Sequence, residues 1–227
     1  MHVGVQKGNG MDYAGVYPFW ESLSEEDRER IACACYRKTY SKGMLMHRGQ
    51  ENCMGLFFVV EGQLRSYILS DEGREVTLFR VPAGEVCVLS ASCLMSSIAF
   101  DVLIEAVEQT EVLVLPSICL NEIMAHNPYA ELYLYKTAAE KFSEVMWTMQ
   151  QVLFRRIDQR VAGFLWEEFS CTGSKTLDIT HDRIARNIGS AREVVTKALK
   201  YLAGHEAIGL RRGKVVILSL EKLQKFL

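Results

Sequence analysis

The sequence predicts an α+β fold with an N-terminal antiparallel, jelly-roll-like β-roll, one long helix and a small C-terminal helical domain that ends in a hairpin. Three observations carry this prediction. Short β-rich segments separated by turn residues fill the chain from about residue 39 to residue 116. Helical apolar spacing runs from residue 127 to about residue 154. Beyond residue 155 the chain becomes basic and carries two short helical patterns followed by a hairpin pattern.

Length and composition describe a globular protein with room for two modest domains. The chain has 227 residues, of which 49% are hydrophobic and 24% are charged. We expect a leader over residues 1–17, a β-roll domain with flanking helices over 18–126, a long helix over 127–154 and a second domain over 155–227. Seven irregularly spaced cysteines, no signal-peptide layout and no membrane-length apolar run predict a cytoplasmic protein without a membrane partner.

The first element expected after the leader is a helix that begins near residue 24. Ser24 is a favourable N-cap and Asp27 places a carboxylate in the first turn. Strands separated by turns follow it, and their spacing predicts an antiparallel roll or barrel. The expected strands span residues 55–60, 62–69, 75–79, 101–107 and 111–115, with turns at 70–73 and 82–85.

The long helix carries two overlapping apolar stripes at heptad spacing. One stripe comprises Tyr135, Ala138, Phe142, Val145, Met149 and Val152, and the other comprises Leu132, Tyr135, Ala139, Phe142, Met146, Met149 and Leu153. A helix that only covers its own β-roll needs one stripe, whereas a helix that also packs against a twin needs both. Homodimerisation is therefore the preferred interpretation over a plain core helix, with Tyr135, Phe142, Met146, Met149 and Leu153 as the expected dimer residues.

Two helices separated by Gly189 are expected next. Glycine at such a turn adopts positive φ without a Cβ penalty, and Ser190 with Glu193 has capping-box spacing for the second helix. We expect buried faces made of Ile184, Ala185 and Ile188 on the first helix and Val194, Val195, Ala198, Leu199 and Leu202 on the second. The other face of the second helix carries Arg192, Glu193, Thr196, Lys197 and Lys200. This pattern fits either a helix-turn-helix DNA reader or an ordinary helical hairpin with a solvated face.

The segment after these helices favours the DNA reader. Residues 209–218 form a hairpin pattern with a basic turn, which is the composition of a wing. Charge is also divided along the chain. Residues 1–154 hold 12 Lys and Arg against 20 Asp and Glu, whereas residues 155–227 hold 14 against 8. A basic domain on an acidic chain fits a polyanionic partner, so we expect a winged helix-turn-helix that binds double-stranded DNA.

The order of these elements resembles the CRP/FNR family of bacterial transcription regulators from about residue 20 onward. The matching motifs are Lys42-Gly43, the segment 55–62, Gly84-Glu85, Arg160-Val-Ala and Arg192-Glu193. The resemblance implies a sensor domain, a homodimer, a two-fold symmetric operator, and RNA polymerase as a candidate partner. It also implies that effector binding in the β-roll shifts a population between two dimer states through a hinge near residues 154–158.

Relatives read bases with an Arg-Glu pair and a second Arg four residues after the Glu. Here Arg192 and Glu193 match, Lys197 replaces the second Arg, and Val194 stands where relatives often carry a small hydroxyl residue. Arg can donate a fork to guanine and Glu can accept from cytosine, whereas Lys lacks the planar fork. We expect base reading by Arg192, Glu193, Thr196 and Lys197, and phosphate contacts by Lys200, Arg211, Arg212 and Lys214.

The effector of the β-roll stays open. Cyclic-nucleotide-binding relatives place an Arg after the Gly-Glu turn to pair with the phosphate, but residues 81–154 contain no arginine, so cyclic AMP is not expected. The apolar replacement segment suits an uncharged or aromatic effector, or simply a filled pocket. The expected pocket residues are Gly84, Glu85, Cys87, Cys93, Phe142 and Met146.

Cysteine and histidine chemistry provide the alternatives, and no cofactor is assigned. Cys87 and Cys93 could form a redox couple, ligate haem or metal, bond a reactive effector, or act as buried packing. Cys33-x-Cys35 lies in a predicted helix whose side chains diverge, which argues against an iron-sulfur cluster. His47 and His126 are conceivable haem ligands without ligand spacing, and we expect surface or satisfied histidines.

Two other classes of function remain to be weighed. A sensor module that acts only through protein partners would not need the basic wing. An enzyme built on a β-roll would need clustered His and carboxylate ligands on neighbouring strands, yet no histidine occurs from residue 57 to residue 115. We therefore expect no catalytic residues and no metal site.

Overall fold

The structure, a computed structural model, describes residues 5–7, 12–48, 54–95 and 102–227. The side chains of residues 5–7, 47 and 48 lie outside the described part, so the expectation that His47 is a surface or satisfied histidine stays a prediction. Most of the first ten residues and Asp101, the start of one expected strand, lie outside it as well. The chain divides into two compact units, one made of residues 1–68 and 78–145 and the other of residues 69–77 and 146–227.

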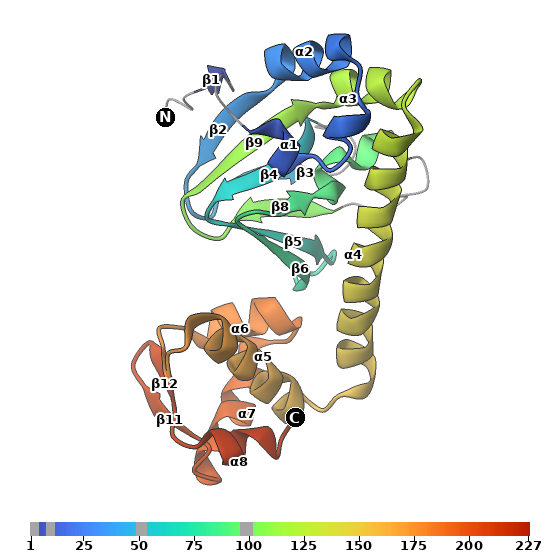
Figure 1. Ribbon diagram of the computed structural model, residues 1–227. Coiled ribbons are helices and arrows are strands. Elements are labelled where there is room, and N and C mark those ends of the chain that lie inside the picture. Colours follow the sequence, from blue (N-terminus) through green and yellow to red (C-terminus); the bar gives the residue numbers. More distant parts are fainter. Residues whose placement is uncertain (1–4, 8–11, 49–53, 96–101) are drawn as a thin grey trace. The chain divides into compact units, whose positions relative to one another are not determined.

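The first 154 residues form two antiparallel sheets, several short helical elements and one long helix (Figure 1). The first sheet has the strand order β1-β2-β9-β4-β7 and the second has the order β3-β8-β5-β6. The strands span Val5–Lys7 (β1), Tyr36–Tyr40 (β2), Leu45–Arg48 (β3), Gly55–Glu61 (β4), Gln63–Leu69 (β5), Glu75–Pro82 (β6), Val86–Cys87 (β7), Leu103–Ala106 (β8) and Thr110–Pro116 (β9). The helical elements span Tyr13–Val16 (α1), Trp20–Ser22 (η1), Glu25–Ala34 (α2), Val88–Leu94 (η3), Ser117–Met124 (α3) and Pro128–Phe154 (α4).

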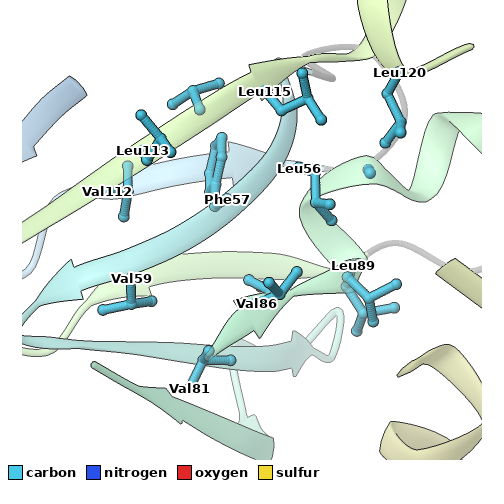
Figure 2. Close-up of a cluster of buried hydrophobic side chains, with 14 of the residues drawn as sticks. Leu56, Phe57, Val59, Val81, Val86, Leu89, Val112, Leu113, Leu115 and Leu120 are labelled. Atoms are coloured by element: carbon cyan, nitrogen blue, oxygen red, sulfur yellow. The ribbon is translucent and has the colours of Figure 1, made fainter. Parts of the chain in front are cut away.

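This arrangement confirms the predicted antiparallel β-roll. Strand β4 pairs with β9 in an antiparallel register that places Phe57 opposite Val114 and Val59 opposite Val112. Buried side chains from β4, β9, β6 and η3 meet between the strands, as Figure 2 shows for Phe57, Val81, Leu89 and Leu113. Ser90 fixes η3 to β4, because its hydroxyl accepts from Phe57 N at 2.9 Å and donates to Cys87 O at 2.6 Å. Apolar burial and this satisfied buried hydroxyl together hold the roll.

The last residues of the expected leader are not loose. Residues 13–17 form α1 and its C-cap, and Tyr13, Val16 and Tyr17 are buried in the core. Asp12 caps the helix by accepting from Gly15 N. The leader assigned to residues 1–17 is thus too long, because three large apolar side chains provide enough burial to order the last part of it.

Helix α2 begins as expected, with Ser24 as its N-cap. A carboxylate of its first turn reaches across the fold, since Asp27 Oδ2 lies 3.0 Å from His126 Nε2. The hydrogen bond to Asp27 raises the pKa of His126. Burial alone would raise the pKa of Asp27, but the hydrogen bonds to His126 and Ser24 outweigh it and lower that pKa. His126 is therefore a satisfied histidine, as expected.

Helix α4 confirms the long helix but not the two stripes as predicted, because Tyr135, Phe142 and Met149, which belong to both, are all exposed. Ala130 and Leu134 are buried, and Tyr133, Ala138 and Val145 pack against the same core. On another side of the helix an exposed apolar stripe remains, with Phe142 64% and Leu153 63% exposed. Its large members are Leu132, Tyr135, Phe142, Met146, Met149 and Leu153.

The C-terminal unit has its own core. Its elements are α5 (Ile157–Thr172), β10 (Thr176–Leu177), α6 (His181–Ile188), α7 (Arg192–Gly204), β11 (Ile208–Arg211), β12 (Lys214–Ile217) and α8 (Leu220–Gln224). The three strands form a sheet in the order β10-β12-β11. Helix α5 starts at Ile157, within the expected hinge of residues 154–158 and directly after the break that follows Phe154. Buried residues from α5, α6, α7 and the sheet form one apolar cluster, which makes this unit a winged helix-turn-helix fold.

The turn between α6 and α7 has the predicted glycine geometry. Gly189 ends α6 in the left-handed region at φ 63° and ψ 49°, where its N–H bonds to Ala185 O. The expected capping box at Ser190 is wrong, because Ala191 is the N-cap of α7 and makes no side-chain cap. Ser190 N instead bonds back to Ala185 O at 2.9 Å, so this residue belongs to the turn.

We predict that Gly189→Ala lowers the stability of the C-terminal unit by about 1–2 kcal/mol, because an L side chain is strained in the left-handed region. Gly163→Ala is the matched control: Gly163 lies inside α5, and nothing lies within 4 Å of its added Cβ. The control should be neutral or stabilising by about 0.5–1 kcal/mol. Urea unfolding followed by circular dichroism measures both, and equal effects would contradict the assigned role of Gly189.

Candidate nucleic-acid interface

Helices α6 and α7 form the helix-turn-helix that the sequence predicts. Thr180 caps α6 by accepting from Arg183 N at 3.2 Å. Ile184 and Ala185 on α6 and Val195, Ala198, Leu199 and Leu202 on α7 are buried, and Ile188 packs against the same cluster. Val194 is 41% exposed, so its assignment to the buried face is wrong. Like Glu193 it lies on the exposed side of α7, whereas the adjacent Val195 is buried as expected.

Three of the four expected base-reading side chains are exposed on α7. These are Arg192, Glu193 and Lys197, and all three lie within the first two turns of the helix. Thr196 is half-buried, and its hydroxyl donates to the carbonyl of Arg192 at 2.8 Å and lies 2.9 Å from His181 Nδ1. Because the single hydroxyl hydrogen is donated to Arg192 O, a base contact by Thr196 would use its acceptor lone pairs or its methyl group.

Strands β11 and β12 form the wing, and it carries cations at its tip. Arg211 pairs with Lys214 across the two-residue turn Arg212-Gly213, in which Gly213 has φ 72°. Arg211, Arg212 and Lys214 are all exposed, as is Lys200 on α7. Lys214 also pairs with Asp178 at 2.8 Å. The four residues expected to contact phosphates are therefore open to solvent, at the tip of the wing and on the second half of α7.

Two residues that contact the predicted base-reading residues were not identified from the sequence. Asp182 Oδ2 lies 3.2 Å from Arg192 Nη1, and His181 contacts Thr196 as described above. Both belong to the first turn of α6, so they join the two helices on the exposed side. Neither contact follows a motif, because it depends on how two helices cross and not on spacing along one of them.

Arg160, a residue of the Arg160-Val-Ala match, also has a local structural role. Its guanidinium donates to the carbonyl of Ile188, the last residue of α6. Helix ends leave carbonyls without an intrahelical partner, and a guanidinium is a suitable donor for them. Helix α5 is thereby tied to the turn that precedes the reading helix.

The expected effector residues are placed in three different environments. Cys87 is fully buried, and burial raises the pKa of its thiol to about 11, so this cysteine behaves as an unreactive core residue. The turn Gly84-Glu85 is exposed, and Phe142 and Met146 lie on the exposed stripe of α4. Within one chain these residues therefore do not line a common interior, and the effector pocket stays a prediction.

A cation missed by the sequence reasoning lies beside that turn. Lys141 of α4 pairs with Glu85 at 3.2 Å and with Glu144 at 2.7 Å, and its ammonium sits over the ring of Phe79. Burial alone would lower the pKa of Lys141, but the two carboxylates outweigh it and raise that pKa. The long helix is thus tied electrostatically to the Gly84-Glu85 turn.

The cysteines narrow the redox hypotheses. Cys93 is exposed and disulfide-bonded, whereas Cys87 is free, so a couple formed between these two residues is not present. Cys33 is exposed and Cys35 is buried, and Cys35 lies outside the expected helix, because it is the extended C-cap of α2. Within the described residues, no group of three or more His, Cys, Asp or Glu side chains is placed to hold a metal ion. Of the helices described, none combines the length and the apolar character that a bilayer span needs.

Comparisons with known proteins match both units. Residues 37–127 match the model of the cyclic nucleotide-binding domain, and residues 159–226 match that of the Crp-like helix-turn-helix domain. A crystal structure from Eubacterium rectale, of a transcriptional regulator assigned to the CRP/FNR family, is 40% identical with a TM-score of 0.90, over 93% of this chain and 98% of that one.

Curated relatives agree. The transcriptional activator protein Anr of Pseudomonas protegens is 25% identical over 87% of this chain and 83% of its own. The transcriptional regulator SdrP of Thermus thermophilus is 28% identical over 74% of this chain and 81% of its own.

Proposed function

Because the chain belongs to the CRP/FNR family of transcription regulators, we propose that it acts as a homodimer on a two-fold symmetric DNA site under the control of a signal received in its β-roll. Its place of action is the bacterial cytoplasm, at promoters, with RNA polymerase as a partner. One observation carries the proposal above the others: a helix-turn-helix whose second helix presents Arg192, Glu193 and Lys197 to solvent beside a basic wing.

In this proposal the residues that read bases lie in the first two turns of α7. Arg192 can donate a planar fork to guanine O6 and N7, and Glu193 can accept from the amino group of cytosine. Lys197 provides a point charge with flexible donors and no fixed fork, so it discriminates between bases less sharply than an arginine would. Lys200, Arg211, Arg212 and Lys214 bind phosphates and set the position of the domain on the duplex without reading sequence.

Two copies are needed because α4 has an apolar stripe that its own β-roll does not cover. Tyr135, Phe142, Met149 and Leu153 are exposed on this stripe at heptad spacing. A twin helix related by a two-fold axis would bury the same stripe on both chains. The two reading helices would then reach half-sites about 34 Å apart, which is one turn of DNA.

Cyclic AMP is not the proposed signal. Residues 81–154 contain no arginine, and their lysines are Lys136 and Lys141. Lys141 is already paired with two carboxylates, so a cyclic phosphate would have to displace them. We propose that the signal is an uncharged small molecule or a redox change, and that it acts by shifting the dimer between two states through the α4–α5 junction.

A specific observation favours thiol oxidation as the redox form of this signal. Cys93 is exposed and disulfide-bonded in the β-roll, and disulfides in reducing compartments are usually transient and sensing. Oxidation would remove two electrons and two protons from a pair of thiols and pass the electrons to an oxidant such as a peroxide.

We expect Arg192→Ala to lower affinity for the preferred DNA site by about 1–3 kcal/mol per half-site while barely changing affinity for random DNA. Lys214→Ala should weaken specific and random DNA about equally, because phosphate contacts carry no sequence information. Fluorescence anisotropy at fixed salt with both DNAs measures this contrast. Equal losses on the two DNAs for Arg192→Ala would refute its assignment to base reading.

Phe142→Glu should convert the dimer into a monomer, because a carboxylate at the centre of the exposed stripe of α4 opposes its burial against a twin. Sedimentation velocity measures the mass, and operator affinity should fall with it. Lys136→Glu places a carboxylate on a side of α4 that is neither stripe nor roll-facing, and it should stay dimeric. A monomeric Phe142→Glu protein with full operator affinity would contradict the proposed dimer.

If thiol oxidation is the signal, DNA affinity of the purified protein should differ between reduced and peroxide-treated samples, and Cys93→Ser should abolish the difference. Cys33→Ser provides the control, since Cys33 is an exposed free thiol of the same unit. An unchanged response in Cys93→Ser, or one lost in Cys33→Ser alone, would exclude Cys93 as the sensing residue.

A further inference from the structure

Two adjacent residues at the start of α6 hold two residues of the reading helix. Asp182 pairs with the side chain of Arg192 at 3.2 Å, and His181 Nδ1 lies 2.9 Å from the hydroxyl of Thr196. Arg192 and Thr196 are four residues apart on α7, so they stand one above the other on the same face. The two contacts therefore form a pair of parallel links between the helices.

Both links converge on Arg192. The hydroxyl of Thr196 donates to the carbonyl of Arg192 at 2.8 Å, and the same hydroxyl lies 2.9 Å from His181 Nδ1. Asp182 holds the side chain of Arg192. The backbone carbonyl of Arg192 contacts the hydroxyl of Thr196, which in turn contacts His181, the residue before Asp182.

The contact with Asp182 leaves the Nε and Nη2 edge of the Arg192 guanidinium free to bind a base. A guanidinium is planar and offers five N–H donors in a fixed fork. Asp182 engages Nη1 alone, and no hydrogen bond from a described residue occupies Nε or Nη2. The Nε and Nη2 edge has the two parallel donors that match O6 and N7 of guanine.

We propose that Asp182 is a specificity-determining positioning residue: it fixes Arg192 through Nη1 so that the opposite edge faces the base. This inference rests on the proposed DNA-binding function. Asp182 and Arg192 are about half exposed, so their ion pair contributes little to folding stability. Its effect is to reduce the rotamer freedom that Arg192 must lose on binding, which is a gain in preorganisation.

The same carboxylate acts against non-specific binding. A negative charge close to a polyanion weakens binding to every DNA sequence. It also keeps Arg192 from being captured by phosphates, because a guanidinium already paired on one edge gains less from a phosphate. Asp182 thus trades total affinity for a larger ratio of specific to random binding.

The wing supplies a matched control. Asp178 pairs with Lys214 at 2.8 Å, so it is also an exposed carboxylate that partners a DNA-facing cation. Lys214 is assigned to phosphate contact, which carries no sequence information. Asp182→Asn and Asp178→Asn change the charge of the domain equally but act on cations with different tasks.

The experiment first selects the preferred DNA site of the wild-type dimer from a random duplex library. Affinities are then measured by anisotropy for that site, for versions altered at each base pair and for random DNA. For Asp182→Asn we expect several-fold tighter binding to random DNA and about a 10-fold smaller preference at the symmetric base pair that Arg192→Ala identifies. Asp178→Asn should tighten binding to random DNA similarly and leave every base preference unchanged.

Two further variants separate positioning from charge. Asp182→Glu keeps the carboxylate and should restore part of the preference. Arg192→Ala with Asp182→Asn should lose no more preference than Arg192→Ala alone, because the two residues act through one contact. Thermal melts confirm folding, and Asp182→Ser provides a second neutral substitution.

Full base preference in both neutral variants, or an equal loss in Asp178→Asn, would overturn the role of Asp182. A wild-type protein that selects no sequence would instead overturn the proposed function, and this role with it.

Discussion

The rest of this protein depends on one constraint, which is that α4 is apolar on two sides and only one of them packs against its own chain. Ala130 and Leu134 are buried and anchor the helix to the core of the β-roll, while Phe142 and Leu153 remain exposed. One face of α4 packs against the core of its own chain, and the other face is left exposed as an apolar surface. The ion pairs of Lys141 with Glu85 and Glu144 add a polar link to the roll-facing packing. The turn at Glu85 and the proposed dimer helix are therefore in direct contact.

Much of this architecture is predictable from the sequence because it depends on local spacing of apolar and turn residues. Turn residues separate the strands of the β-roll, heptad spacing marks α4, and Gly189 marks the turn of the helix-turn-helix. Errors arise where local pattern competes with three-dimensional context. Val194 is apolar yet exposed, because the adjacent Val195 takes the buried position. Ser190 has capping spacing, yet it belongs to the glycine turn, because its backbone N–H donates to the carbonyl of Ala185.

The candidate site divides in the same way. Arg192, Glu193 and Lys197 are identifiable because they share the exposed face of one helix, which spacing alone reveals. Asp182 and His181 are not identifiable in this way, because their partners lie on another helix and are fixed by crossing geometry. The β-roll interior is harder still. Cys87 is a chemically versatile residue in the sequence, but full burial and a raised pKa of about 11 make it an inert part of the core.

The bond from Arg160 to Ile188 has a consequence for how such a protein can be regulated. It ties α5, the first helix beyond the α4–α5 junction, to the end of α6 just before the reading helix. Helices α5, α6 and α7 also share one apolar cluster, so their packing holds the helix-turn-helix together. Under the proposed function, a signal acting through the α4–α5 junction would change where the DNA-reading residues are carried and not how they are arranged. An isolated half-site would be recognised identically with and without the signal, and only the paired site would distinguish the two states.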